Sequence, residues 1–130
     1  MDAQLPASTP TLLVVDDDAN ISRALSNLLE GEGYRVISAE NGKRGLELVE
    51  AGLRPDAIIL DLMMPVMDGW DFRAEQLKDP AICETPVIVL TATGFSRRTI
   101  REQFGWVEYI PKPPPPDHLL DTLRRVCAPH

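Results

Sequence analysis

Three uninterrupted apolar runs constrain the fold of this chain more than any other feature. They cover residues 12–15, 57–60 and 87–90, and apolar residues at helical spacing fill much of the chain between them. Strands that are apolar on both faces are typical of a parallel sheet covered by helices on both sides. The alternation of strands and helices predicts βαβ units. The fold class is therefore α/β, with a doubly wound five-stranded parallel sheet.

Two further predicted strands, residues 34–38 and 107–110, are interrupted by polar side chains. Arg35 lies in the first and Glu108 in the second, and Pro111 follows the second directly. Such strands suit the edges of a sheet, where proline is tolerated. The predicted strand order is then 2-1-3-4-5, a flavodoxin-like (βα)5 arrangement, whose ligands bind beyond the carboxyl ends of the first and third strands.

Five helices are predicted, and local signals mark where several of them begin. Asn20 is a candidate cap for the first helix and Asp68 for the third, which is predicted over residues 70–78. The fourth, over residues 96–104, should be short or mobile because the interval between Thr91 and Lys112 is tight. The last helix is expected to follow four prolines.

Length and charge place the chain among ordinary single-domain proteins. One domain is predicted over residues 12–127, with a loose tail over residues 1–11 and a short tail over 128–130. The 20 acidic and 13 basic residues give a net charge of −7, which disfavours direct nucleic-acid binding. No apolar run approaches the roughly 18 residues of a membrane span. Cys83 and Cys127 are expected to be free thiols in a cytoplasmic protein.

The side chains that could carry chemistry all fall at the ends of predicted strands. These are Asp16 and Asp17 after the first strand, Asp61 after the third, Thr91 after the fourth, and Lys112 just past the fifth. Clustered carboxylates resist ionising together unless a cation joins them, and hard oxygen ligands favour Mg²⁺. A carboxylate beside Mg²⁺ can attack phosphorus and form an aspartyl-phosphate. The pocket would neutralise charge on the phosphoryl oxygens.

The motifs around these residues resemble those of response-regulator receiver domains, the chemotaxis-regulator-like superfamily. The motifs are LLVVDDD, ILDLMMPVMDG, VIVLTA and YIPKP, and the resemblance runs from about Leu12 to Val126. It implies that Asp61 is the phosphoacceptor. It also implies that Asp16 and Asp17 bind Mg²⁺ together with Asp61.

The resemblance implies roles for four more residues. Met63 would lend its backbone carbonyl to the metal, and Lys112 would pair with a phosphoryl oxygen. Thr91 would contact the phosphoryl group and move toward it. Tyr109 would be the aromatic switch residue that turns inward when Thr91 moves.

The implied function is a phosphoacceptor switch in two-component phosphorelay signalling. A sensor histidine kinase or histidine phosphotransfer protein would pass a phosphoryl group from phosphohistidine to Asp61, forming 4-aspartylphosphate. The face of the fourth helix, fifth strand and fifth helix would then change state and meet a downstream protein target. The chain would assist its own phosphotransfer and autodephosphorylation without being a turnover enzyme. It would be a monomer or weak dimer, without direct nucleic-acid binding or membrane insertion.

Two alternative functions stay open at this point. A Mg²⁺-dependent phosphatase would also form an aspartyl-phosphate, but such enzymes usually show a second aspartate where this chain has Met63. A degenerate receiver could act as a binding module, although every chemical residue of the family is present.

Three features depart from the family pattern or stay outside the site. Pro113–Pro116 stand where receivers have one proline, and they predict a polyproline-like spacer. Arg97, Arg98 and Arg101 form a basic patch that is either a solvated face or a partner contact. Asp18 is interpreted as a solvated or helix-starting residue.

Overall fold

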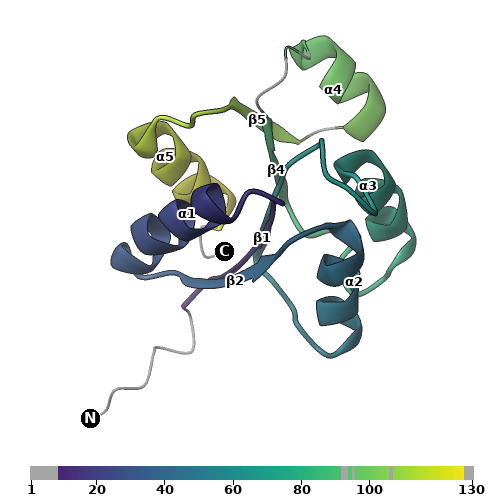
Figure 1. Cartoon of the computed structure of the whole chain (residues 1–130), viewed down its shortest axis with the longest axis horizontal. Helices are drawn as coiled ribbons and strands as arrows, with labels where there is room; N and C mark the ends of the chain where they lie inside the picture. The colour runs from purple at the N-terminus through teal and green to yellow at the C-terminus, as the bar shows by residue number, and fades with distance from the viewer. Residues whose placement is uncertain (1–8, 92–93, 95, 106, 128–130) are drawn as a thin grey trace.

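A computed structural model of the chain describes residues 9–91, 94, 96–105 and 107–127 (Figure 1). These residues form five strands and five helices in strict alternation. In chain order they are β1 (Thr11–Val15), α1 (Ala19–Gly31), β2 (Arg35–Ala39), α2 (Gly42–Glu50), β3 (Ala57–Leu60), α3 (Gly69–Lys78), β4 (Val87–Thr91), α4 (Arg97–Phe104), β5 (Glu108–Pro111) and α5 (Pro116–Val126). Of the tail predicted over residues 1–11, residues 1–8 lie outside the described residues, and Thr11 already belongs to β1. The tail predicted over residues 128–130 also lies outside the described residues.

The five strands form one parallel sheet in the order β2-β1-β3-β4-β5, which confirms the predicted fold class and order. Helices α1 and α5 cover one face, and α2, α3 and α4 cover the other (Figure 1). β1 and β3 pair directly, with Val15 opposite Leu60. The topology therefore brings the residues that follow β1 and β3 to the same end of the sheet.

The central strands are apolar throughout because both of their faces are buried. In β1, Leu12 and Val14 pack into the cluster under α1 and α5, while Leu13 and Val15 pack into the cluster on the other face. All four are fully buried. The edge strands differ as predicted: Arg35 in β2 is exposed, and Glu108 in β5 is only half-buried.

Two helix starts were predicted with different success. Asp68 caps α3, since its Oδ1 accepts a hydrogen bond from the Asp71 N–H at 2.9 Å, as predicted. The prediction of Asn20 as the α1 cap is wrong. Asp18 caps α1, because its extended backbone places Oδ1 within 2.9 Å of the Asn20 nitrogen and 3.2 Å of the Ile21 nitrogen.

The four prolines, Pro113–Pro116, were predicted to form a spacer, but the last two belong to the start of α5. Pro116 is the first residue of α5 and Pro115 is its cap. Proline suits the first helical position, where its missing N–H would have had no partner in the helix. The Lys112–Pro113 peptide bond is cis. No helix among the described residues is long and apolar enough to cross a bilayer.

Candidate functional site

Asp16 and Asp61 extend the β1–β3 pairing by one residue beyond the strands. The Asp61 N–H donates to the Val15 carbonyl at 2.9 Å, and the Asp16 N–H donates to the Ala39 carbonyl at 3.0 Å. These bonds fix both backbones at the carboxyl end of the sheet. Both residues are buried, so the fold holds two carboxylates in a place that is poor in water.

Asp17 completes a group of three carboxylates at this end of the sheet. One oxygen each from Asp16, Asp17 and Asp61 lies within 4.8 Å of the other two. Asp17 is exposed while the other two are buried, so the group opens to solvent on one side. Mg²⁺ prefers such hard oxygen ligands and retains several waters. The chemistry and openness of this donor set therefore fit Mg²⁺.

Lys112 reaches the same carboxylates from the loop after β5. Its ammonium Nζ lies 2.7 Å from Asp16 Oδ2 and 3.4 Å from Asp61 Oδ2, and its side chain is only 9% exposed. Burial alone would lower the pKa of Lys112, but the hydrogen bond and charge of Asp16, with the charge of Asp61, raise it above its usual value. Lys112 is therefore a permanent cation in the site.

The Asp61 carboxyl has a pKa above its ordinary value. Burial is the largest cause, and the neighbouring Asp16 charge adds to it. Lys112 and the Met63 N–H, 3.4 Å from Asp61 Oδ1, act in the opposite direction without cancelling the rise. One ammonium is thus insufficient for the cluster, and a further cation would favour full ionisation.

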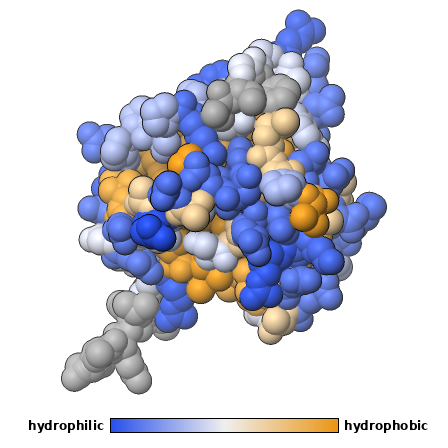
Figure 2. Space-filling view, in the orientation of Figure 1, coloured by the Kyte–Doolittle hydropathy of each residue, from blue (hydrophilic) through white to orange (hydrophobic). Residues whose placement is uncertain are grey.

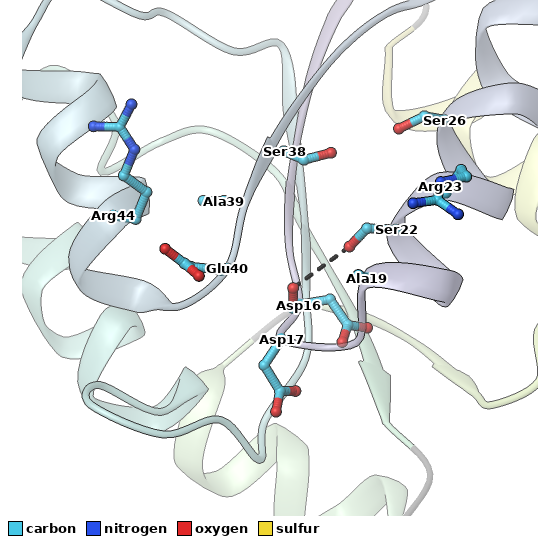
Figure 3. A pocket seen from close by; sticks show the side chains of 10 residues that line it. All are labelled: Asp16, Asp17, Ala19, Ser22, Arg23, Ser26, Ser38, Ala39, Glu40 and Arg44. Carbon is cyan, nitrogen blue, oxygen red and sulfur yellow. Dashed lines mark hydrogen bonds between the residues drawn. The ribbon is translucent and has the colours of Figure 1, made fainter.

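Asp16 is held in position by the turn that leads into α1. Its Oδ1 accepts the Asp18 N–H at 2.9 Å, which leaves Oδ2 facing Lys112. The Ser22 hydroxyl lies 3.4 Å from the Asp16 carbonyl, the contact drawn as a dashed line in Figure 3. Asp18 is therefore a helix-starting residue, as interpreted, and it also supports the site through its backbone.

A polar cleft of about 440 Å³ adjoins the carboxylates on the α1–β2 side. Asp16 and Asp17 lie at one end of it, Ser22 projects from α1, and Arg44 projects from α2 on the opposite wall (Figure 3). The cleft leaves the exposed side of the metal-binding group accessible to solvent.

Thr91 and Tyr109 lie on the two strands beyond β3. Thr91 ends β4 and is buried, and its carbonyl accepts the Lys112 N–H at 3.0 Å. Tyr109 is half-buried and pairs in register with Val89, while the Arg97 guanidinium lies 5.7 Å from its ring centroid. The structure thus joins Asp16, Asp17, Asp61 and Lys112 into one cluster. The contact of Thr91 with a phosphoryl group and the inward turn of Tyr109 stay predictions.

The loop after Asp61 is tightly packed against the site. Met63 has a 55% exposed side chain and directs its N–H at Asp61, and its carbonyl role stays a prediction. A Cβ at Gly69 would collide with the Asp61 carbonyl oxygen and lie 2.8 Å from the Leu62 Cα. Glycine is needed there because of this close approach.

One contact of this loop was missed by the sequence reasoning. The Gly42 N–H, at the start of α2, donates to the Met67 carbonyl at 3.1 Å, and a Cβ at Gly42 would lie 2.8 Å from the Met67 Cγ. The Asn41-Gly42 pair reads as a turn in the sequence, and nothing local indicates its distant partner. This contact fixes the far end of the loop that carries Met63.

Comparison with known proteins agrees with this geometry. The family model of the response regulator receiver domain matches residues 12–124. The response regulator MprA of Mycolicibacterium vanbaalenii is 39% identical over 114 residues, which cover 87% of this chain and 48% of that protein. The probable transcriptional regulator ycf27 of Guillardia theta is 37% identical over 116 residues, which cover 88% of this chain and 44% of that protein. The chain spans about half the length of the curated relatives it matches.

Solved structures cover the chain more completely. The Vibrio cholerae chemotaxis protein CheY4 has a TM-score of 0.82 and 32% identity, over 91% of this chain and 98% of that one. The receiver domain of a Pseudomonas aeruginosa sensor histidine kinase, solved with magnesium in its active-site cleft, has a TM-score of 0.82 and 28% identity, over 93% and 99%. This chain belongs to the response regulator receiver domain family of two-component signalling.

Proposed function

We propose that this receiver domain is a magnesium-dependent switch whose phosphoacceptor is Asp61. The observation that carries the proposal is the cluster in which three carboxylates lie within 4.8 Å and Lys112 contacts two of them. Asp61 is the member at the end of the central strand β3. Asp16, Asp17, Asp61 and the Met63 carbonyl would hold Mg²⁺, which would neutralise charge on the carboxylates and on a phosphoryl group.

The reaction is a transfer of a phosphoryl group between two side chains. One Asp61 carboxylate oxygen attacks the phosphorus of a phosphohistidine on the partner protein and forms a P–O bond. The P–N bond breaks and its electron pair returns to the imidazole. The chain's own groups position the reactants, because phosphoryl transfer depends mainly on alignment and charge neutralisation.

Lys112 changes partners in this proposal. Without metal it pairs with Asp16 at 2.7 Å, and it would turn to a phosphoryl oxygen if Mg²⁺ neutralised the carboxylates in its place. Thr91, at the end of the neighbouring strand, would donate its hydroxyl to another phosphoryl oxygen. Its movement would permit Tyr109 to turn inward and shift the surface of α4, β5 and α5 to a second state.

The partners follow from the family and from the acceptor chemistry. Receiver domains of this family interact with sensor histidine kinases. We expect the immediate donor to be such a kinase or a histidine phosphotransfer protein, and the output to be a protein target. We also propose autodephosphorylation, in which a water oxygen attacks the phosphorus of phosphorylated Asp61. The bond between phosphorus and the Asp61 oxygen breaks, the carboxylate is restored and inorganic phosphate leaves. The cytoplasmic location and the monomeric or weakly dimeric state stay predictions.

The phosphatase alternative requires a second acid–base group beside the acceptor. Met63 occupies that position, and its exposed thioether cannot exchange a proton. We therefore favour a switch that is phosphorylated once per cycle.

Labelling with acetyl phosphate and Mg²⁺, followed by intact mass spectrometry, tests the assignment. Wild type should gain one phosphoryl group, and Asp61→Asn should gain none. Asp117→Asn, an exposed aspartate in the first turn of α5, is the matched control and should label like wild type. Persistent labelling of Asp61→Asn would overturn the assignment.

A further inference from the structure

Two of the three arginines of α4 occupy positions that do not favour the helix itself. Arg97 and Arg98 are its first two residues after the Ser96 cap, and the first turn has no acidic residue. The N-terminus of a helix carries a partial positive charge, so cations there are unfavourable. Arg97 and Arg101 also lie one turn apart with like charges. Helix stability therefore does not explain why arginine stands at positions 97 and 98, whereas Arg101 lies in the last turn, where a cation favours the helix.

The same three arginines are directed toward solvent. Arg97, Arg98 and Arg101 are exposed, and the buried residues of α4 are Ile100 and Phe104. Arg98 pairs with Glu102 at 3.4 Å, but those side chains are 87% and 62% exposed, so the pair contributes little. The surface over α4, at the top of Figure 2, is hydrophilic. Core packing does not explain Arg97 and Arg98 either, since the side chains that α4 buries are Ile100 and Phe104.

The charge of α4 is opposite to that of the protein. Its eight residues contain three arginines and one glutamate, whereas the whole chain carries −7. A local region of opposite sign attracts a partner of complementary charge and fixes its orientation. A long polyanion such as nucleic acid would extend beyond α4 over a protein of net charge −7, whereas a short acidic segment can stay on α4.

We infer that Arg97, Arg98 and Arg101, the arginine face of α4, dock an acidic segment of a partner protein. The inference rests on the proposed function, because it names the kind of target that the switch surface contacts. Arg97 links docking to the switch, since its guanidinium lies over the Tyr109 ring at 5.7 Å. A carboxylate that pairs with Arg97 draws it from the ring, so docking and Tyr109 rotation influence each other in both directions.

Binding of a fluorescent poly-glutamate peptide to the full chain tests the inference by anisotropy and by NMR shifts. Measurements are made in Mg²⁺ with and without beryllofluoride, a mimic of the phosphoryl group. The peptide should shift α4 resonances and bind more tightly with beryllofluoride. A variant combining Arg97→Gln, Arg98→Gln and Arg101→Gln should bind at least about tenfold more weakly, as expected for the loss of close charge pairs.

The matched control combines Arg35→Gln, Lys43→Gln and Lys78→Gln, three exposed residues of β2, α2 and α3 with the same total charge change. It should bind like wild type. Equal weakening by both triple variants, unchanged binding by the α4 variant, or no binding by wild type at physiological salt each overturns the inference. The proposed function is measured separately, because beryllofluoride should shift resonances around Asp61 in wild type and in both variants. Failure of that shift alone contradicts the phosphoacceptor assignment and leaves the peptide result interpretable.

Discussion

At the scale of single residues, the fold places Asp61 where ionisation is unfavourable. Burial and the Asp16 charge raise its pKa above the ordinary value of 3.8. The folded state therefore binds the Asp61 proton more tightly than the unfolded state does. This contribution to stability is present below the unfolded pKa and is lost as the pH rises through the folded pKa. At neutral pH without metal, the ionised carboxylate opposes folding.

We predict that Asp61→Asn stabilises the metal-free protein at pH 7, because it removes this buried charge and retains the side-chain shape. The gain should shrink as the pH falls through the raised pKa of Asp61, because the wild-type carboxyl then becomes protonated. Urea denaturation of both proteins in EDTA across this pH range measures the difference. A variant that is less stable than wild type at pH 7 would contradict the assignment of a raised pKa.

Lys112 balances the same charges in the metal-free state. We predict that Lys112→Met lowers the free energy of unfolding in EDTA by about 3 kcal/mol, because Asp16 and Asp61 lose their buried partner. Mg²⁺ should restore much of the loss, since it replaces the missing positive charge. Urea denaturation with and without Mg²⁺ measures both effects. Lys78→Met, which breaks an exposed pair with Glu75, should change neither.

The sequence predicts the members of the site better than the interactions that hold them. Asp16, Asp17, Asp61 and Lys112 follow from the rule that parallel strands end at one edge. The choice between Asp18 and Asn20 as the cap of α1, and the need for glycine at position 69, do not follow, because they depend on the backbone geometry of the folded chain. The local amino-acid composition does not indicate such close approaches between distant segments.

At the scale of elements, Arg73 joins α3 to the end of α4. Its Nε and Nη2 donate to the Phe104 carbonyl at 3.2 and 2.8 Å, and its Nη1 donates to Gln76 at 2.8 Å. The Trp70 and Phe104 rings lie 4.7 Å apart in the same contact. The carbonyl groups at a helix C-terminus lack partners within the helix, and Arg73 supplies one.

We predict that Arg73→Met loosens the last turn of α4 and leaves the sheet unchanged. Loss of a charge-assisted hydrogen bond of roughly 1.5 kcal/mol corresponds to amide exchange about tenfold faster in that turn. Hydrogen exchange at the Gly105 amide, which bonds to the Arg101 carbonyl, reports it. Arg98→Met, on the exposed side of α4, serves as the control. Equal acceleration in β1 would show global unfolding instead.

The start of α3 has no space for a side chain. We predict that Gly69→Ala destabilises the protein by about 2 kcal/mol, because the new methyl group would overlap the Asp61 carbonyl oxygen and crowd Leu62. Gly31→Ala, at the end of α1, is the matched control, since nothing lies within 4 Å of its Cβ position. Thermal denaturation compares the two, and equal midpoints would contradict the crowding.

Element order could be predicted from the sequence, whereas element ends could be predicted less well. Arg35 and Glu108 correctly marked the edge strands, because polar groups are tolerated where one side of a strand lacks a partner. Strands β2 and β5 each begin one residue later than predicted, and Pro116 enters α5. These ends depend on which backbone groups find partners, and side-chain polarity does not report that.

At the scale of the whole molecule, metal binding should be linked to folding. The three carboxylates come together only in the folded chain, so Mg²⁺ binds the folded state selectively. We predict that Mg²⁺ at a hundred times its Kd raises the free energy of unfolding by about 2.7 kcal/mol. Thermal denaturation in Mg²⁺ and in EDTA measures the shift, which Asp17→Asn should greatly reduce. NaCl at equal ionic strength should not reproduce it, and a shift of the same size in NaCl would exclude specific binding.

The overall architecture could be predicted from the sequence because one rule governs most of it. A sheet buried on both faces requires solid apolar strands, and residues 12–15, 57–60 and 87–90 meet that requirement. The cleft of Figure 3 could not be predicted from the sequence. It forms where small side chains of α1 and β2 leave space beside Asp16, and such space depends on how separate elements pack.

The contact between Gly69 and Asp61 has a mechanical consequence for the molecule. Gly69 lies against the backbone of Asp61 and Leu62, and the ring of the next residue, Trp70, contacts the ring of Phe104 at the end of α4. Two consecutive residues of α3 thus contact both the segment that carries Asp61 and the last turn of α4. This contact holds the C-terminal end of α4 in place. A rotation of the helix about that end would therefore move the opposite end, which follows Ser96 and carries Arg97 and Arg98, over the largest distance.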